Sequence, residues 1–193
     1  MRNLIRPAII AMVALTLITG VVYPLLVTGV SAVAFHRQAE GSLIMSGDSA
    51  RGSLVIGQPF SDPKYFWSRA SFTSPVPYNG SLSYASNYGP TNQAQIDAVK
   101  ARVEALKAAD PGNTAPIPVD LVTASGSGLD PDITPAAALY QLSRVARVRG
   151  LPTEQVEALV QRFTKGRQFG ILGEPRVTVL PLNLALDSLS GGH

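Results

Sequence analysis

Residues 123–130 bring three small hydroxyl side chains and two glycines together in one short stretch, Thr-Ala-Ser-Gly-Ser-Gly-Leu-Asp. Glycine lets a backbone come close to another molecule, and hydroxyl and carbonyl oxygens can bind that molecule. A serine beside glycine on a strand-to-helix turn can also be exposed as a nucleophile. The same composition is typical of a tight connection between two elements. The stretch is therefore either a ligand-approach loop or a structural turn.

The positions of the histidines disfavour a serine hydrolase. Ser125 or Ser127 would need an imidazole base, as in a Ser-His-acid arrangement. The sequence has two histidines, His36 beside the apolar N-terminal stretch and His193 at the last position. Neither is placed to serve a serine in this stretch, so the sequence predicts no catalytic site of its own.

Metal and phosphate sites have little support. The chain has no cysteine, and Pro131 restricts the convergence of Asp130 and Asp132 on one ion. Asp130 is therefore expected to be a turn or cap residue. The glycines at 126 and 128 are not followed by the Gly-Lys-Ser/Thr ending of a phosphate-binding loop. The sequence predicts no metal and no firmly bound cofactor.

The charge balance excludes nucleic acid as a partner class. Of the 16 Lys and Arg residues, Arg2 and Arg6 precede the apolar stretch, which leaves 14 basic against 13 acidic residues from position 37 onward. A nucleic-acid interface needs a strongly basic surface. Seven basic residues gather in the last third and are expected to lie on solvated helix faces: Arg144, Arg147, Arg149, Arg162, Lys165, Arg167 and Arg176.

The element that fixes where these residues act is the charge-free stretch 7–35, flanked by Arg2 and Arg6 before it and by His36 and Arg37 after it. A helix rises about 1.5 Å per residue, so roughly 20 apolar residues cross about 30 Å of hydrocarbon. A cleaved signal peptide is the alternative, because residues 32–34 have the spacing of a cleavage site, but its apolar core has about 7 to 15 residues. We therefore expect a retained helix that crosses the bilayer. Pro24 can kink this helix, and neighbouring helices can cover the backbone carbonyl that the proline leaves without a partner.

The chain is divided accordingly into a short cytoplasmic N-terminus (1–6), a transmembrane helix (7–35), a stalk (36–52) and an extracytoplasmic domain (53–193). The free N-terminal amine and the short leading tail favour the N-terminus inside. The remaining length suits a single core. The predicted fold class is α+β, with one N-terminal transmembrane helix followed by one compact extracytoplasmic domain.

Capping and periodicity place the elements of that domain. Helices are predicted over 91–109 with Thr91 as cap, over 135–149 with Thr134 as cap and Gly150 as stop, and over 153–164. Strands are predicted over 53–56, 117–125, 176–180 and 182–186, with Pro181 breaking the last two apart. Residues 61–92 are rich in Pro, Gly, Ser, Asn and aromatics and have no helical period. This segment is either pinned to the core by Phe66 and Trp67 or exposed at a partner surface.

Several motifs resemble the C subunit of the Kdp potassium-transporting ATPase. The resemblance is carried by residues 120–131, 134–138 and 144–146, and extends to 54–58, 65–69, 86–87, 89–92 and 182–187. The chain departs from the family pattern at Ala70, where Pro is usual, at Tyr84-Ala85, where a Gly pair is usual, and at Asp132, where His is frequent. These departures put in doubt any role assigned to that His or to the flexibility of the Gly pair.

The resemblance implies an accessory, non-catalytic subunit of a bacterial inner-membrane potassium uptake complex. Its partners would be an ATP-hydrolysing P-type subunit, a potassium-binding channel-like subunit and a very small membrane subunit. It also implies a catalytic chaperone that raises the ATP affinity of the catalytic subunit, with ATP bound transiently and shared. The alternative is a free-standing membrane-anchored binding or sensor domain.

Two mechanisms follow as hypotheses. In the first, the effect on ATP affinity passes through packing of the anchor against the pump. In the second, oxygen-rich loops over 71–92 and 123–130 cover the potassium entrance. The candidate partner-contact or ligand-approach residues are Trp67, Arg69, Asn87, Asn92, Thr123, Ser125, Gly126, Ser127, Gly128 and Asp130.

Overall fold

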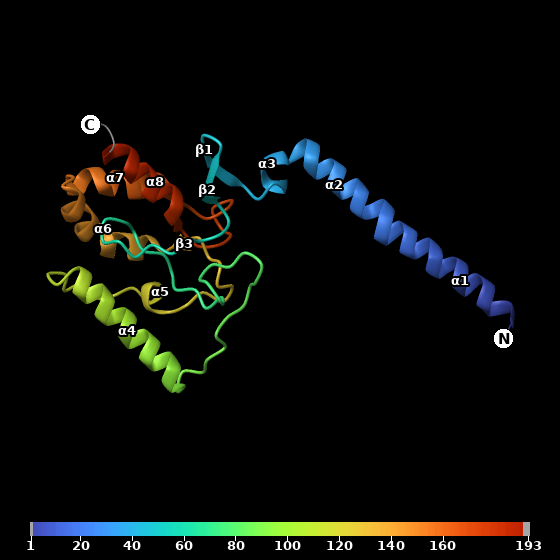
Figure 1. Cartoon of the computed structure of the whole chain (residues 1–193), viewed down its shortest axis with the longest axis horizontal. Coiled ribbons are helices and arrows are strands. Elements are labelled where there is room, and N and C mark those ends of the chain that lie inside the picture. Colours follow the sequence, from blue (N-terminus) through green and yellow to red (C-terminus); the bar gives the residue numbers. More distant parts are fainter. Residues whose placement is uncertain (1, 191–193) are drawn as a thin grey trace. The chain divides into compact units, whose positions relative to one another are not determined.

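The computed structural model describes residues 2–190, and the prediction for His193 lies outside them. The chain divides into two compact units, one ending at Leu43 and one beginning at Ile44 (Figure 1). The first unit is helical. The second, which contains the candidate site residues, combines helices with small sheets and confirms the α+β prediction.

The N-terminal unit is one long apolar helix followed by a short one. It runs through α1 (Arg2–Leu17), a π-helical turn η1 (Ile18–Val22) and α2 (Tyr23–Ala34), and α3 (His36–Ala39) follows. Residues Leu4–Ala34 form the one helix within the described part of the chain that is long and apolar enough to cross a membrane. None of its most apolar window is buried by the rest of the chain. The predicted apolar helix is therefore present.

Pro24 is accommodated by the π-helical turn directly before it. The Tyr23 N–H donates to the Ile18 carbonyl, five residues back, rather than four. Proline has no N–H, and its ring collides with the carbonyl four residues earlier in a regular α-helix. A local π turn is one of the ways in which a helix absorbs that conflict.

The second unit is built around helices with two small antiparallel sheets. β1 (Leu43–Ser46) and β2 (Ser49–Ser53) form a two-stranded sheet, and β3 (Asp132–Ile133), β5 (Arg176–Thr178) and β4 (Thr164–Lys165) form another in the order β3-β5-β4. The helices are α4 (Gln93–Ala109), α5 (Val119–Val122), α6 (Pro135–Arg149), α7 (Thr153–Phe163) and α8 (Val179–Ser190). In Figure 1, α5 lies between α4 and α6.

The start and end of α6 are as predicted. The Thr134 hydroxyl accepts a hydrogen bond from the Ala137 N–H at 3.0 Å, and Pro135 occupies the first helical position. Gly150 ends the helix with a φ of 64°, a left-handed conformation that glycine adopts without strain. The predicted α7 is also present. Both helices place their apolar faces in the core.

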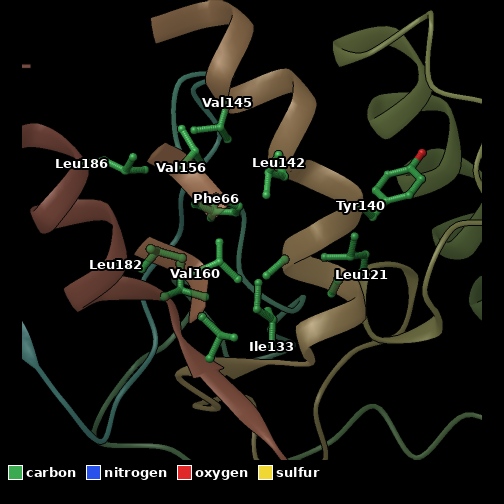
Figure 2. Packing of buried hydrophobic residues seen from close by; sticks show 14 of the residues in the cluster. Phe66, Leu121, Ile133, Tyr140, Leu142, Val145, Val156, Val160, Leu182 and Leu186 are labelled. Atoms are coloured by element: carbon green, nitrogen blue, oxygen red, sulfur yellow. The ribbon is translucent and has the colours of Figure 1, made fainter. Parts of the chain in front are cut away.

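The core lies where α6, α7 and α8 meet β3 and β5. Figure 2 shows Leu142 and Val145 of α6 near Val156 and Val160 of α7, with Leu182 and Leu186 of α8 on the other side. Phe66, from the irregular segment 61–92, is fully buried among them. For Phe66, the structure therefore supports the first alternative, in which this residue fixes the segment to the core.

Two of the predicted strands are replaced by helices. Residues 182–186 belong to helix α8, which begins at Val179. Pro181 lies in the first turn of α8, where the missing N–H has no helical partner to lose. Residues 117–125 contain the short helix α5 instead of a strand, and only Ala124 keeps a strand-like bridge, parallel to Ala70.

Two further predictions shift in position. The strand predicted over 53–56 is wrong, because β2 ends at Ser53. Helix α3, strand β1 and all of β2 except Ser53 lie within residues 36–52, which were expected to be a stalk. The cap of α4 is Asn92, not Thr91, since the Asn92 side chain accepts from the Ala94 N–H at 2.9 Å. Asparagine and threonine both cap helices, so sequence alone does not decide which of two neighbouring residues is the cap.

Candidate functional site

Phe66 and Trp67 are fixed by side chains from two distant helices. Asn183 of α8 accepts from the Phe66 N–H at 2.9 Å and donates to the Phe66 carbonyl at 2.9 Å. Gln141 of α6 does the same for Trp67, at 2.7 Å and 3.2 Å. An amide side chain that satisfies both backbone groups of one residue substitutes for a strand partner. We call Phe66, Trp67, Gln141, Arg144 and Asn183 the aromatic clamp.

Arg144 completes the aromatic clamp from inside the protein. It is 1% exposed, and the Arg149 side chain is 5% exposed, so the expectation that all seven basic residues of the last third are solvated is wrong for these two. Its Nη1 donates to the carbonyls of Pro63 and Tyr65, and its Nη2 donates to Gln141 Oε1 at 2.7 Å. Burial lowers the pKa of the guanidinium to about 10, which leaves it charged at neutral pH.

Residues 123–130 pack against the segment that follows the aromatic clamp. The Ser125 N–H donates to the Ala70 carbonyl at 3.1 Å, and the Ser71 hydroxyl donates to the Gly128 carbonyl at 2.6 Å. Arg69 and Asp130 form an ion pair, with 2.8 Å between Nη1 and Oδ2. The structure therefore brings four of the predicted residues together: Arg69, Ser125, Gly128 and Asp130.

The hydroxyl groups of residues 123–130 are used within the protein. Ser125 Oγ accepts from the Gly128 N–H at 2.8 Å, and Ser127 Oγ accepts from the Leu129 N–H at 3.1 Å. The Thr123 hydroxyl donates to the Val119 carbonyl at 2.8 Å. This stretch is a self-bonded turn, and a buried Ser125 is not available to attack a substrate.

Tyr78 packs beside this turn. Its hydroxyl donates to the Arg69 carbonyl, and its ring lies against Gly57, where an added Cβ would come within 2.4 Å of a ring carbon and 2.5 Å of the Asp130 carbonyl. Burial raises the pKa of the Tyr78 phenol to about 12, and the nearby Asp130 charge acts in the same direction. Only glycine fits at position 57, because the backbone there lies directly against both the Tyr78 ring and the Asp130 carbonyl.

A charged cavity of about 250 Å³ opens beside this turn. Arg69 pairs with Asp130 in its lining, and Arg176 Nε pairs with Asp132 Oδ2 at 3.0 Å. Asp132 Oδ1 is buried and has no hydrogen-bond partner among the described residues. Asp132 is the position at which the resembled family frequently has His, so this departure lies in the cavity wall.

The cavity does not fit a nucleotide phosphate. Four carboxylates line it, those of Asp120, Asp130, Asp132 and Glu174, and its two guanidinium groups already pair with carboxylates. A phosphate in the cavity would therefore lie beside like charges, which repel it. Within residues 2–190, no group of three or more His, Cys, Asp or Glu side chains is arranged to hold a metal ion.

The other predicted residues lie outside this cluster. Asn92 caps α4. Asn87 is exposed and has a left-handed φ of 53°. Gly126 is exposed and has open space around it. The Tyr84-Ala85 departure falls in the same irregular stretch as Asn87, and Ala70 forms the bridge with Ala124.

Sequence reasoning missed Gln141 and Asn183 as contributors to the site. Their partners lie 74 and 117 residues away in the chain, so no local pattern reveals the contact. The available signal was a polar residue at a position of the helical pattern that faces the core, as for Gln141 in α6. Buried polar side chains need partners, and both have them.

The chain is similar over nearly its whole length to one family of proteins. The family described as "KdpC: K+-transporting ATPase, c chain" matches residues 5–188. A protein of Methylococcus capsulatus, named potassium-transporting ATPase KdpC subunit, is 61% identical over 98% of this chain and 100% of its own length. Proteins of the same name from Dechloromonas aromatica and Variovorax paradoxus are 60% and 61% identical, over 98% and 97% of this chain and 100% and 97% of their own lengths.

Proposed function

The chain belongs to the KdpC family of K+-transporting ATPase c chains, and from this membership we propose that it is an accessory, non-catalytic subunit of an ATP-driven potassium uptake complex. Its partners in this proposal are a P-type subunit that hydrolyses ATP, a channel-like subunit that binds potassium, and a very small membrane subunit. The apolar helix holds it in the bacterial inner membrane, with the N-terminus in the cytoplasm and the domain outside.

One observation carries the proposal: the family match covers both units of the chain. Residues 5–188 include the apolar helix Leu4–Ala34 almost entirely and the domain with its aromatic clamp. A free-standing domain that shared only the fold would have no reason to match through the membrane helix. The self-bonded turn at 123–130 supports a structural, non-catalytic role, because its hydroxyls stabilise the loop.

We propose further that the subunit acts as a catalytic chaperone that raises the ATP affinity of the P-type subunit. The charged cavity has no place for phosphates, and the sequence has no phosphate-binding loop. The effect on ATP therefore travels through packing of the apolar helix against the pump, as a coupling free energy between distinct sites. A coupling of about 1–3 kcal/mol corresponds to a roughly 5- to 150-fold change in ATP affinity.

The first test is purification of the complex through a C-terminal tag on this chain, from membranes in mild detergent. Recovery of a P-type ATPase and a potassium-binding subunit, with potassium-stimulated ATP hydrolysis, is the expected result. Recovery of the chain alone from several detergents would contradict the proposal and favour an anchored binding or sensor domain.

The second test separates coupling from direct contact with ATP. The ATP concentration for half-maximal hydrolysis is measured for the complex with and without this subunit, and it should rise when the subunit is absent. A photoreactive ATP analogue should label the P-type subunit in the intact complex. Specific labelling of this chain, competed by ATP, would show that coupling through the helix is the wrong mechanism.

A further inference from the structure

The loop between β4 and β5 carries three apolar side chains that the domain does not bury. Phe169, Ile171 and Leu172, here called the apolar tip, are 92%, 74% and 54% exposed. Within the described part of the domain, Phe169 and Ile171 are the most exposed large apolar side chains. Leaving such a side chain in water forgoes about 1.5–3 kcal/mol of burial. The stability of the domain therefore does not explain them.

The apolar tip is preformed. Gln168 and Leu172 exchange backbone hydrogen bonds of 2.8 and 2.9 Å, and Arg167 Nη2 binds both carboxylate oxygens of Glu174 at 2.7 Å at the base of the loop. Phe169 has a φ of 54°, a left-handed conformation that a bulky residue rarely adopts. The loop thus has one defined conformation, in which the Phe169 ring is exposed to water.

Basic residues precede the apolar tip in the chain. Arg167 and Glu174 neutralise each other, whereas Lys165 and Arg162 are exposed and have no ion-pair partner among residues 2–190. Apolar groups beside lysine and arginine suit the boundary between hydrocarbon and anionic lipid headgroups. The chemistry of this loop therefore complements a negatively charged bilayer surface.

The chain itself keeps such a surface close. Nine residues, 35–43, separate the end of the apolar helix at Ala34 from the start of the domain unit at Ile44. Even fully extended, this connection reaches only about 30 Å. Contact between the tip and the bilayer is then intramolecular, so a weak intrinsic affinity is enough.

We propose that the apolar tip enters the headgroup region of the bilayer that holds the chain's own apolar helix, and that anionic lipid strengthens this contact. The proposal rests on the proposed function in one respect, that the apolar helix is retained as an anchor. The contact gives the domain a second attachment to the membrane and limits its rotation about the connection.

The absence of cysteine from the sequence makes a site-specific test direct. Phe169→Cys in the full chain is labelled with an environment-sensitive nitrobenzoxadiazole dye, and the chain is placed in nanodiscs, both alone and within the purified complex. The matched control is Glu104→Cys, at an exposed position on α4. Lipids with a doxyl quencher just below the headgroups should quench the label at 169 roughly twofold more than the label at 104, if the tip inserts and α4 stays in water.

The lipid dependence tests the charge argument. Quenching at 169 should be stronger with one-third anionic lipid than with zwitterionic lipid alone, and 1 M salt should reduce the difference, because screening then acts within about 3 Å. Lys165→Gln should weaken the anionic-lipid effect without changing the urea midpoint of the domain.

Three results would overturn the proposal. A label at 169 with the emission of a water-exposed dye would place the tip in solvent. A blue-shifted but unquenched label in the complex, insensitive to lipid composition, would place it on another subunit. Release of the unlabelled chain from membranes by alkaline carbonate would contradict the anchor in the proposed function as well, whereas retention with an unquenched label contradicts this proposal alone.

Discussion

The guanidinium carbon of Arg144 lies 4.6 Å from the centre of the Trp67 ring, stacked beneath it inside the protein. The same guanidinium donates to two backbone carbonyls of the segment that carries Trp67, those of Pro63 and Tyr65. Within the aromatic clamp, the Arg144 guanidinium therefore supplies hydrogen bonds that secondary structure would otherwise provide, because segment 61–69 has no strand or helix of its own.

Arg144→Ala should destabilise the domain by about 3–5 kcal/mol, because it leaves buried carbonyls unpaired and a hollow under the ring. Trp67 is the only tryptophan, so its fluorescence during urea unfolding of the full chain in detergent reports this site. Ser143→Ala is the matched control, an exposed neighbour on the same helix, expected to change stability by less than about 0.5 kcal/mol. Equal stability of the two variants would contradict the clamp.

Gly57→Ala should cost about 1–3 kcal/mol, because its Cβ would overlap the Tyr78 ring and the Asp130 carbonyl. Gly126→Ala is the control in the facing turn, where a Cβ has open space. The urea midpoints of both variants are compared with that of the unchanged chain. An unchanged urea midpoint in Gly57→Ala would show that residues 57, 78 and 130 are not in close contact.

Tyr78 should make stability fall as the pH rises from about 10 to about 12. The unfolded phenol titrates near 10, whereas the folded pKa is about 12. Between these values the folded state binds more protons, so its advantage is complete below pH 10 and is lost as the pH approaches 12. Tyr78→Phe should show a shallower decline in urea midpoint between pH 9 and 11. Parallel declines for both proteins would contradict the raised pKa.

Asn87→Gly tests whether the loops over 71–92 cover the potassium entrance. Asn87 has a left-handed backbone and an exposed side chain, so glycine removes the amide without backbone strain. Losing one oxygen contact of about 0.5–1.5 kcal/mol should raise the half-saturating potassium concentration of ATP hydrolysis roughly 2- to 10-fold. Ser127→Ala is compared in parallel. Unchanged potassium affinity in both variants, with intact assembly, would remove these loops from the potassium path.

The parts of the fold that sequence predicted are those set by local rules. Helix α6 follows from its caps, and helix α7 follows from the spacing of its apolar residues. The strand predicted at 182–186 failed because a short apolar run fits a strand or a buried helix, and Pro181 was taken as a break when the first turn of a helix tolerates it.

The candidate site was predicted in pieces. The motifs over 65–69, 144–146 and 182–187 were recognised separately, and the structure joins them, since Tyr65 donates to Asp187 at 2.9 Å and Arg144 binds the Tyr65 carbonyl. Burial of Arg144 was not predictable from charge counting, because whether a cation is solvated depends on contacts across about 80 residues of chain.

The π-helical turn at Ile18–Val22 changes which way the two halves of the apolar helix face. Each residue of an α-helix advances about 100° around the axis, so the extra residue in this turn offsets the angular phase of α2 relative to α1 by about that amount. A neighbour that follows a straight stripe of side chains down α1 therefore meets a different side of α2. In the membrane position proposed above, this one continuous helix offers differently oriented contact surfaces to the two leaflets of the bilayer.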